Sequence, residues 1–234
     1  MTRPSRPDMR QHWDRFGREN PMFYIETTRE EWSREEFLSS GAETVDMVME
    51  WLGEEGPRER ALEIGCGLGR LSHHLARSFQ RVDGVDVAPS MIEQGNQMGL
   101  RDNVQLHLIS GADLEAFESG NYDLVFSYLV FQHVPDAEVL RRYLHEIARV
   151  LKPGGRAVLQ YDTRPEGILL KLYKSLPDPL LPRAHRRFIR RYRRRAQWLR
   201  EEIRTAKLEV LDERAPNTAE HFFMLASRPD SPGR

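Results

Sequence analysis

A strand, a glycine-rich turn and a helix follow one another around residues Ala61 to Arg70, which read Ala-Leu-Glu-Ile-Gly-Cys-Gly-Leu-Gly-Arg. The apolar run before the turn predicts a strand, and the spacing of Leu71 and Leu75 after it predicts a helix. Glycine accepts positive φ angles and has no Cβ to obstruct a ligand. Because a helix start offers unpaired N–H groups, this turn can hold a small polar ligand at the end of the strand. A tight turn without any ligand is the alternative.

The spacing of the glycines narrows the kind of ligand. Gly65, Gly67 and Gly69 stand at alternate positions. The dinucleotide-binding fingerprint G-x-G-x-x-G would need its third glycine one residue later, where the chain has Arg70. The turn therefore favours a nucleotide-like ligand other than a dinucleotide.

Strand-like and helix-like segments alternate after residue 60, which predicts an α/β fold with a mostly parallel sheet. The last two strands flank a turn-rich link, Ala215 to Thr218, and are expected to form a hairpin. The predicted strands cover residues 60–64, 81–86, 104–109, 122–127, 156–161, 207–213 and 220–226, and the predicted helices cover residues 69–79, 89–98, 136–151 and 196–206.

The composition fits one domain with a real core, because the chain has 234 residues of which 39% are hydrophobic. A formal net charge of −1 suggests neither nucleic acid nor a membrane surface as a partner. The one cysteine, Cys66, excludes an internal disulfide. No apolar run is long enough to span a membrane and the first residues lack a signal-peptide pattern, so we expect a cytoplasmic protein.

Further motifs follow the glycine turn in order. The second predicted strand ends in Asp86, which can accept the two hydroxyls of a ribose or can cap the helix that follows. The fourth predicted strand lies within Asn121 to Tyr128, and Phe131-Gln-His-Val-Pro135 comes directly after it. A predicted helix then leads to Leu151-Lys-Pro-Gly-Gly-Arg156.

Over residues 60–161 these motifs resemble those of the S-adenosylmethionine (SAM)-dependent methyltransferases with the Rossmann-like fold. Residues 63–69 are similar to motif I of that family, E-x-G-x-G-x-G, and the last two motifs to signatures of bacterial small-molecule members. The resemblance implies a seven-stranded, mostly parallel sheet with an antiparallel last strand and helices on both faces. It also implies SAM as the cofactor, S-adenosylhomocysteine as the product, and no metal.

The resemblance also implies a set of cofactor contacts. Glu63 and the glycines would hold the methionine part of SAM, Asp86 the ribose and Asp113 the adenine. In many relatives the acid comes about two residues before the position of Asp113, so neighbouring backbone N–H groups are an alternative for the adenine. The expected cofactor-binding residues are Glu63, Gly65, Cys66, Gly67, Gly69, Asp86, Val87, Met91, Ala112, Asp113, Leu114 and Ser127.

Methyl transfer to a hydroxyl or amine needs a base near the carboxyl edge of the sheet. His133 is the first candidate and Asp162 the second, and the alternatives are a structural histidine and a turn acid. An antiparallel last strand would begin at this edge and bring His221 to it. No cluster has zinc-ligand spacing. The residues expected at the acceptor or in a lid are Tyr24, Tyr128, Gln132, Tyr161 and His221.

Two segments lie outside the alternating pattern. Residues 1–53 are predicted to form an N-terminal helical cap, and residues 164–195 a lid inserted after the fifth strand. Residues 54–234, lid included, would be the SAM-binding domain, so we expect one domain in all. A small-molecule acceptor and a monomer or homodimer are the expected partners.

The lid ends in an arginine-rich segment, residues 183–195, with eight arginines in thirteen positions. The near-zero net charge favours a solvated helix face rather than a nucleic-acid site. An RNA or lipid methyltransferase that uses Arg183 to Arg195 is the alternative among enzymes. A non-catalytic SAM-binding regulator is the alternative from another class.

Overall fold

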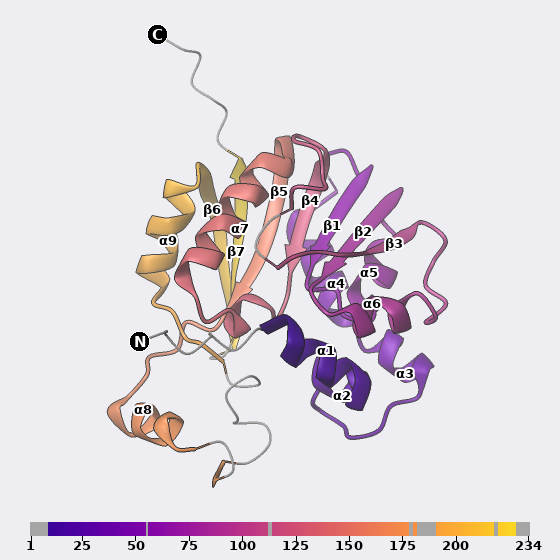
Figure 1. Ribbon diagram of the computed structural model, residues 1–234. Helices are drawn as coiled ribbons and strands as arrows, with labels where there is room; N and C mark the ends of the chain where they lie inside the picture. The colour runs from indigo at the N-terminus through magenta and orange to yellow at the C-terminus, as the bar shows by residue number, and fades with distance from the viewer. Residues whose placement is uncertain are drawn as a thin grey trace. The chain divides into compact units, whose positions relative to one another are not determined.

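The computed structural model of the chain describes residues 9–54, 56–111, 114–177, 180–181, 191–217 and 220–227. The chain divides into two compact units, Met1–Gly111 and Ala112–Arg234 (Figure 1). Seven strands form a mixed sheet in the order β3-β2-β1-β4-β5-β7-β6, which confirms the predicted fold class. The expected division into a cap at residues 1–53 and one domain at 54–234 stays a prediction.

The first unit contains three parallel strands joined by two helices. Parallel strands need a crossover connection, and each helix supplies one. Glu63 pairs with Gly84, and Val82 pairs with Val104. The first two strands have the predicted bounds and the third ends one residue early. These elements are β1 (Arg60–Ile64), α5 (Arg70–Leu75), β2 (Arg81–Asp86), α6 (Pro89–Gly95) and β3 (Val104–Leu108).

In the part of the chain that the structure describes, four helices precede β1 and form a layer on α5 and α6 in the same unit. The side chain of Asp14 accepts a hydrogen bond from Ser90 N at 2.8 Å, so the first helix caps the start of α6. Phe37, Leu68 and Met91 are fully buried in the cluster between these helices. The described part of the segment expected to form a cap is therefore largely helical, with residues 26–33 as a non-helical link. The four helices are α1 (Met9–Glu19), α2 (Pro21–Ile25), α3 (Arg34–Ser39) and α4 (Ala42–Leu52).

The second unit contains four strands, of which the first two are parallel to each other. The last strand is antiparallel to both of its neighbours, as predicted. The strands are β4 (Tyr122–Ser127), β5 (Leu151–Tyr161), β6 (Leu208–Asn217) and β7 (Glu220–Ser227).

Two of these strands are longer than the sequence predicted. β5 begins at Leu151, which pairs with Tyr122 ahead of an irregularity in the ladder. A Cβ on Gly155 would lie 2.9 Å from the Tyr122 carbonyl oxygen, so this close approach requires glycine. β6 continues to Asn217, which pairs with Glu220, although a turn was predicted from Ala215. In both cases pairing with a neighbouring strand extends the element beyond its local signal.

The helices among the described residues of the second unit are α7 (Ala137–Val150), α8 (Ile168–Ser175) and α9 (Ala196–Thr205), with a 3-10 turn, η1 (Phe131–His133). Figure 1 shows α7 and α9 next to each other, beside β5, β6 and β7. Arg141 of α7 binds Glu202 of α9 through two bonds of 2.8 and 2.9 Å. No helix among the described residues has the length and apolar character needed to cross a membrane.

The described end of the arginine-rich segment departs from its prediction. Residues 182–190 lie outside the described residues, and residues 191–195 are not helical. The backbone N–H of Tyr192 donates to Gln132 O at 2.6 Å, and that of Arg194 donates to Asp162 O at 3.1 Å. These bonds hold the segment along the ends of β5 and η1 in place of a solvated helix.

Candidate functional site

The glycine turn after β1 depends on backbone angles that other residues rarely adopt. The φ angles of Gly65, Gly67 and Gly69 are +76°, +54° and +81°. The N–H groups of Gly65 and Cys66 both donate to Val85 O, at 2.7 and 3.0 Å, which ties the turn to β2. The turn is thus a rigid cradle of backbone groups at the carboxyl ends of β1 and β2.

The carboxylate of Asp86 lies against this cradle. One oxygen accepts from Gly67 N and the other from Ala88 N, both at 2.9 Å. Burial raises the pKa of Asp86, and these backbone bonds oppose the rise. Ala88 is the N-cap of α6, so Asp86 braces both the turn and the helix start. A carboxylate has about four acceptor positions, so a partly exposed Asp86 keeps capacity for the two hydroxyls of a ribose.

Glu63 is buried behind the turn, with 2% of its surface exposed. Burial raises the pKa of Glu63 to about 7, although the Ser72 hydroxyl donates to it and the Arg70 charge acts in the opposite direction. A carboxyl with such a pKa can be neutral or ionised near pH 7. It is therefore placed to respond to a cationic group that enters the turn.

Glu63 should make the unliganded protein lose stability as pH rises from about 4.5 to 7. The carboxyl ionises near 4.5 when unfolded but near 7 when folded. Because the folded state binds more protons between these values, the free energy of unfolding falls there, by about 3 kcal/mol at most. In Glu63→Gln the side chain stays neutral, so urea denaturation at pH 5 and 7.5 should show a smaller difference. An equal difference in both proteins would contradict the assignment.

The N-terminal helices cover the glycine turn within the first unit. A Cβ on Gly67 would come within 2.6 Å of Ile25 Cδ1, so the Ile25 side chain lies directly on the turn. The buried Arg70 guanidinium donates to Ser40 O at 3.0 Å and pairs with Glu26 at 3.6 Å. The sequence analysis used Arg70 only as the residue that stands where a dinucleotide-binding motif would have its third glycine. The structure shows that Arg70 fastens the preceding helices to the turn.

Other expected cofactor residues are distributed over both units. In the first unit Val87 follows Asp86, Met91 is in the core and Cys66 is 3% exposed, with burial raising the pKa of its thiol. In the second unit Leu114 is buried and its N–H donates to Glu146 at 3.1 Å. Ser127 is buried at the end of β4, and Ala112 and Asp113 lie outside the described residues.

Tyr24, expected in the lid, belongs to the N-terminal helices. Its ring stacks on Phe16 with centroids 4.1 Å apart, and its hydroxyl donates to Glu19 at 2.9 Å. With 7% of its surface exposed, Tyr24 is part of the packing of the first unit.

His133 ends the 3-10 turn that follows β4. The Gln132 amide nitrogen lies 3.3 Å from His133 Nε2, an arrangement in which the amide donates to the ring. Gln132 is 1% exposed and His133 is partly buried. The turn packs against β5, since the ring of Phe131 stacks on that of Tyr161 with centroids 5.6 Å apart. These contacts fix His133 at the carboxyl end of β4.

Asp162, the second base candidate, is bound by two arginine side chains. Its buried carboxylate accepts from Arg164 Nε at 2.9 Å, and Arg193 Nε lies 3.7 Å away. Burial would raise the pKa of Asp162, but the bonds and charge of Arg164 prevail and lower it. A carboxylate held by two arginines with a lowered pKa is a weak proton acceptor.

Tyr161 and His221 face each other across β5 and β7. The His221 ring lies between two polar groups, with Nε2 at 2.9 Å from Glu213 and Nδ1 at 3.1 Å from the Thr163 hydroxyl. The Tyr161 hydroxyl is buried and has no hydrogen-bond partner among the described residues. Sequence reasoning missed Thr163 and Glu213, because only strand pairing brings them to His221.

Tyr128 contacts the neighbouring residue pair of β5 and β7, Gln160 and Phe222, whose side chains lie on the other face of the sheet from those of Tyr161 and His221. Its hydroxyl donates to Glu220 at 2.6 Å, and its ring stacks on Phe222 with centroids 5.8 Å apart. Gln160 and Phe222 are paired across β5 and β7, and the Gln160 amide oxygen accepts from Leu129 N at 3.0 Å. The second unit therefore gathers Tyr128, Gln132, His133, Tyr161 and His221 around the ends of β4 and β5 and the start of β7.

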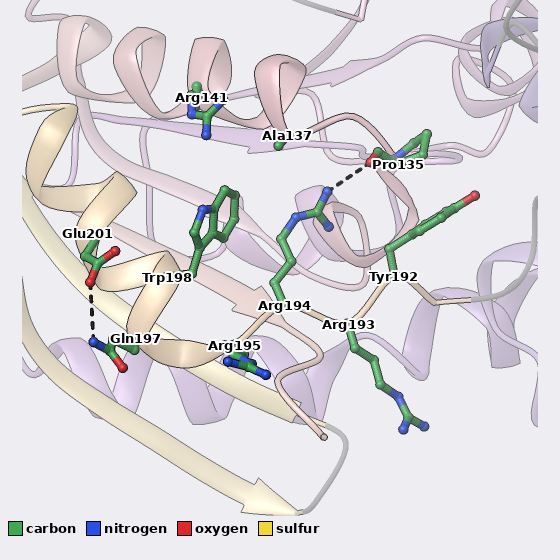
Figure 2. Close-up of a pocket in the computed structure, with 10 residues that line it drawn as sticks. All are labelled: Pro135, Ala137, Arg141, Tyr192, Arg193, Arg194, Arg195, Gln197, Trp198 and Glu201. Atoms are coloured by element: carbon green, nitrogen blue, oxygen red, sulfur yellow. Dashed lines mark hydrogen bonds between the residues drawn. The ribbon is translucent and has the colours of Figure 1, made fainter. Parts of the chain in front are cut away.

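A cavity of about 620 Å³ opens beside this cluster in the second unit (Figure 2). The loop before α7, the first turns of α7 and α9, and residues 192–195 line it. Figure 2 shows Trp198 between the side chains of Arg141 and Arg194. Over the part of the chain that the structure describes, no group of three His, Cys, Asp or Glu side chains could hold a metal ion.

Comparisons with known proteins agree with this geometry. Residues 62–159 match the family described as a methyltransferase domain. A ubiquinone biosynthesis O-methyltransferase of Xanthomonas oryzae is 37% identical over 102 residues, 43% of this chain and 41% of that protein. A 2-methyl-6-phytyl-1,4-hydroquinone methyltransferase of Synechocystis is 28% identical over 127 residues, 53% of this chain and 39% of that protein. The chain spans about two fifths of the length of these curated relatives.

A solved structure shares the fold over nearly the whole chain. Magnesium protoporphyrin IX methyltransferase of Synechocystis with bound SAM superposes with a TM-score of 0.66 at 17% identity, covering 97% of this chain and 100% of that one. At this identity the likeness establishes the fold.

Proposed function

We propose, from the match of residues 62–159 to the methyltransferase-domain family, that this chain transfers a methyl group from SAM to a small molecule. The observation that carries the proposal is the glycine turn braced by Asp86, within a domain that matches the methyltransferase family. SAM supplies an activated methyl group bound to a sulfonium centre. The protein's task is to align the acceptor with that group and to exclude water.

The residues of the turn fit the cofactor. In this proposal Asp86 accepts the two ribose hydroxyls, and the glycines with Glu63 hold the methionine part. A neighbouring ammonium group would favour the ionised form of Glu63, whose pKa lies near 7. Asp113 and Leu114 remain the proposed adenine contacts.

We assign proton removal to His133 rather than Asp162. A hydroxyl or amine acceptor must lose a proton, and an imidazole nitrogen can accept it. Asp162 is committed to Arg164 and Arg193, and its pKa is lowered. Gln132 orients the His133 ring, and Tyr161 and His221 flank the same end of β5.

Relatives suggest the class of acceptor. The two curated relatives are named for ubiquinone biosynthesis and for a hydroquinone substrate. We therefore propose a hydroxylated small molecule, to be sought by radiolabel transfer from SAM to a panel of phenols and catechols. Metal independence, a cytoplasmic location and a monomeric or homodimeric state remain predictions, of which turnover in EDTA and sedimentation would check the first and last.

Titration calorimetry tests the cofactor directly. SAM and S-adenosylhomocysteine should each bind with micromolar affinity, about −7 to −8 kcal/mol. NAD is the control, since the spacing of the glycines does not fit the dinucleotide fingerprint. Heat with NAD and none with SAM would overturn the proposal. Tight SAM binding without turnover on a broad panel would favour the non-catalytic regulator.

A further inference from the structure

The cavity beside α7 and α9 carries an excess of positive charge. Guanidinium groups of Arg141, Arg193, Arg194 and Arg195 line it, and Glu201 supplies the carboxylate in its lining. Nothing in the proposed cofactor site uses these arginines. Their individual partners decide whether the charge is structural or available.

Two of the four guanidinium groups are neutralised by the protein. Arg141 forms two bonds to Glu202, the shorter at 2.8 Å. Arg193 pairs with the buried Asp162 at 3.7 Å and donates to Pro165 O at 3.0 Å. These two arginines therefore have a structural reason to be present.

The other two, Arg194 and Arg195, form no ion pair at contact distance with the described residues. Arg194 Nη2 donates to Val134 O at 2.7 Å, but a carbonyl carries no charge. Arg194 Nη1 is buried and makes no hydrogen bond with the described part of the chain. Burial lowers the pKa of Arg194, and the charges of Tyr161, Tyr192 and Asp136 oppose this fall only in part. Arg195 lines the cavity, is exposed and has no ion pair within the described ranges.

The walls of the cavity add further groups that attract anions. Arg195 is the N-cap of α9 and provides no side-chain cap, so N–H groups of the first turn remain without intrahelical partners. Gln197 and Trp198, in the first turn of this ten-residue helix, line the cavity, so the positive end of the helix lies beside it. The Trp198 ring has guanidinium carbons at 5.8 and 5.7 Å, from Arg141 and Arg194 (Figure 2). This ring offers a flat apolar surface beside the charges.

Topology places the cavity at the end of the second unit where the proposed base lies. α7 follows β4, so its first turn is at the carboxyl end of β4. The N–H of Arg194 donates to the backbone of Asp162, directly after β5. The charge of Arg194 also acts on the buried Tyr161 hydroxyl, which lacks a partner among the described residues. Ligands of α/β sheets bind at such carboxyl ends.

We propose that this cavity binds an oxyanion, a carboxylate or a phosphate, that is carried by the acceptor. The inference rests on the proposed methyl transfer and extends it to the class of substrate. Arg194 and Arg195 supply the charge, the start of α9 supplies N–H donors, and Trp198 packs on the body of the ligand. A neutral acceptor would leave the partly buried Arg194 without an ion pair at contact distance.

Binding of simple anions tests the cavity without turnover. The probes are benzoate for a carboxylate and inorganic phosphate, each titrated into protein labelled with 5-fluorotryptophan. Trp198 is the one tryptophan of the second unit, so its fluorine resonance, assigned with Trp198→Phe, reports on the cavity. We expect one or both probes to shift this resonance saturably, with Kd in the millimolar range. The probe that binds identifies the preferred oxyanion.

Variants then assign the binding to the two arginines. Arg195→Gln removes a charge that has no partner in the described structure, so folding should be unaffected. Arg195→Gln and Arg194→Gln should each weaken the probe about tenfold. The matched control is Arg204→Gln, an exposed arginine at the other end of α9, which should change Kd less than twofold.

Failure of this inference differs from failure of the proposed function. No saturable shift with either probe, or equal affinity in Arg195→Gln and the parent, would overturn the oxyanion site even if SAM binds. Probe binding in a protein that does not bind SAM would support the site and reject methyl transfer. Turnover on neutral phenols at rates that Arg195→Gln and Arg194→Gln leave unchanged would also overturn the inference.

Discussion

His133→Ala is expected to lower kcat by about 10²–10⁴-fold on a hydroxyl or amine acceptor, with SAM affinity unchanged. The ring stands at the carboxyl end of β4, where Gln132 orients it through a 3.3 Å contact. Its competitor Asp162 is held by two arginines, so Asp162 is poorly suited to replace it. Initial rates at saturating SAM and titration calorimetry measure the two quantities.

A second histidine of the same unit provides the control for this variant. His145 is exposed on α7, so His145→Ala should keep the parent's rate. If His133→Ala turns over at a rate close to that of the parent, His133 is a structural histidine and not the base. A raised KM with normal kcat would instead indicate that His133 binds the acceptor without taking its proton.

Asp86→Ala should weaken SAM binding by about 10- to 150-fold, because a charged hydrogen bond contributes about 1.5–3 kcal/mol. The same change removes the acceptor of Gly67 N and Ala88 N, so the free energy of unfolding should also fall, by about 1–2 kcal/mol. Asp86→Asn retains one acceptor oxygen and should lie between the parent and Asp86→Ala. Calorimetry and urea denaturation separate the two effects.

An exposed acid on the neighbouring helix is the matched control. Glu93→Gln on α6 removes a charge without a contact to the turn and should leave both quantities unchanged. Unaltered SAM affinity in a folded Asp86→Ala protein would show that Asp86 only braces the turn and the start of α6.

The sequence predicted those elements whose signals are local. β1, β2 and β4 have the predicted bounds, and each ends either at a polar residue or directly before a glycine. β5 and β6 were predicted too short, since their extra residues are fixed by pairing with β4 and β7. The helix predicted over residues 69–79 is shorter in the structure, where α5 ends at Leu75.

In the candidate site, too, the features with a local sequence signal were predicted and those that depend on distant residues were not. The position of Asp86 beside the glycine turn follows from motif spacing, and the structure joins the two at 2.9 Å. Arg70, Glu213 and Thr163 were missed because their partners come from distant parts of the sequence. The helix expected in the arginine-rich segment was wrong for residues 191–195, because backbone bonds to Gln132 and Asp162 replace helical ones.

The burial of Cys66 in the glycine turn makes the natural thiol chemically quiet. With 3% of its surface exposed and a raised pKa, it offers little thiolate to an alkylating reagent. Since the chain has no other cysteine, a single cysteine introduced at an exposed site such as Leu172 on α8 would react selectively. The native chain is thus already suited to attaching one fluorophore or spin label at a chosen position.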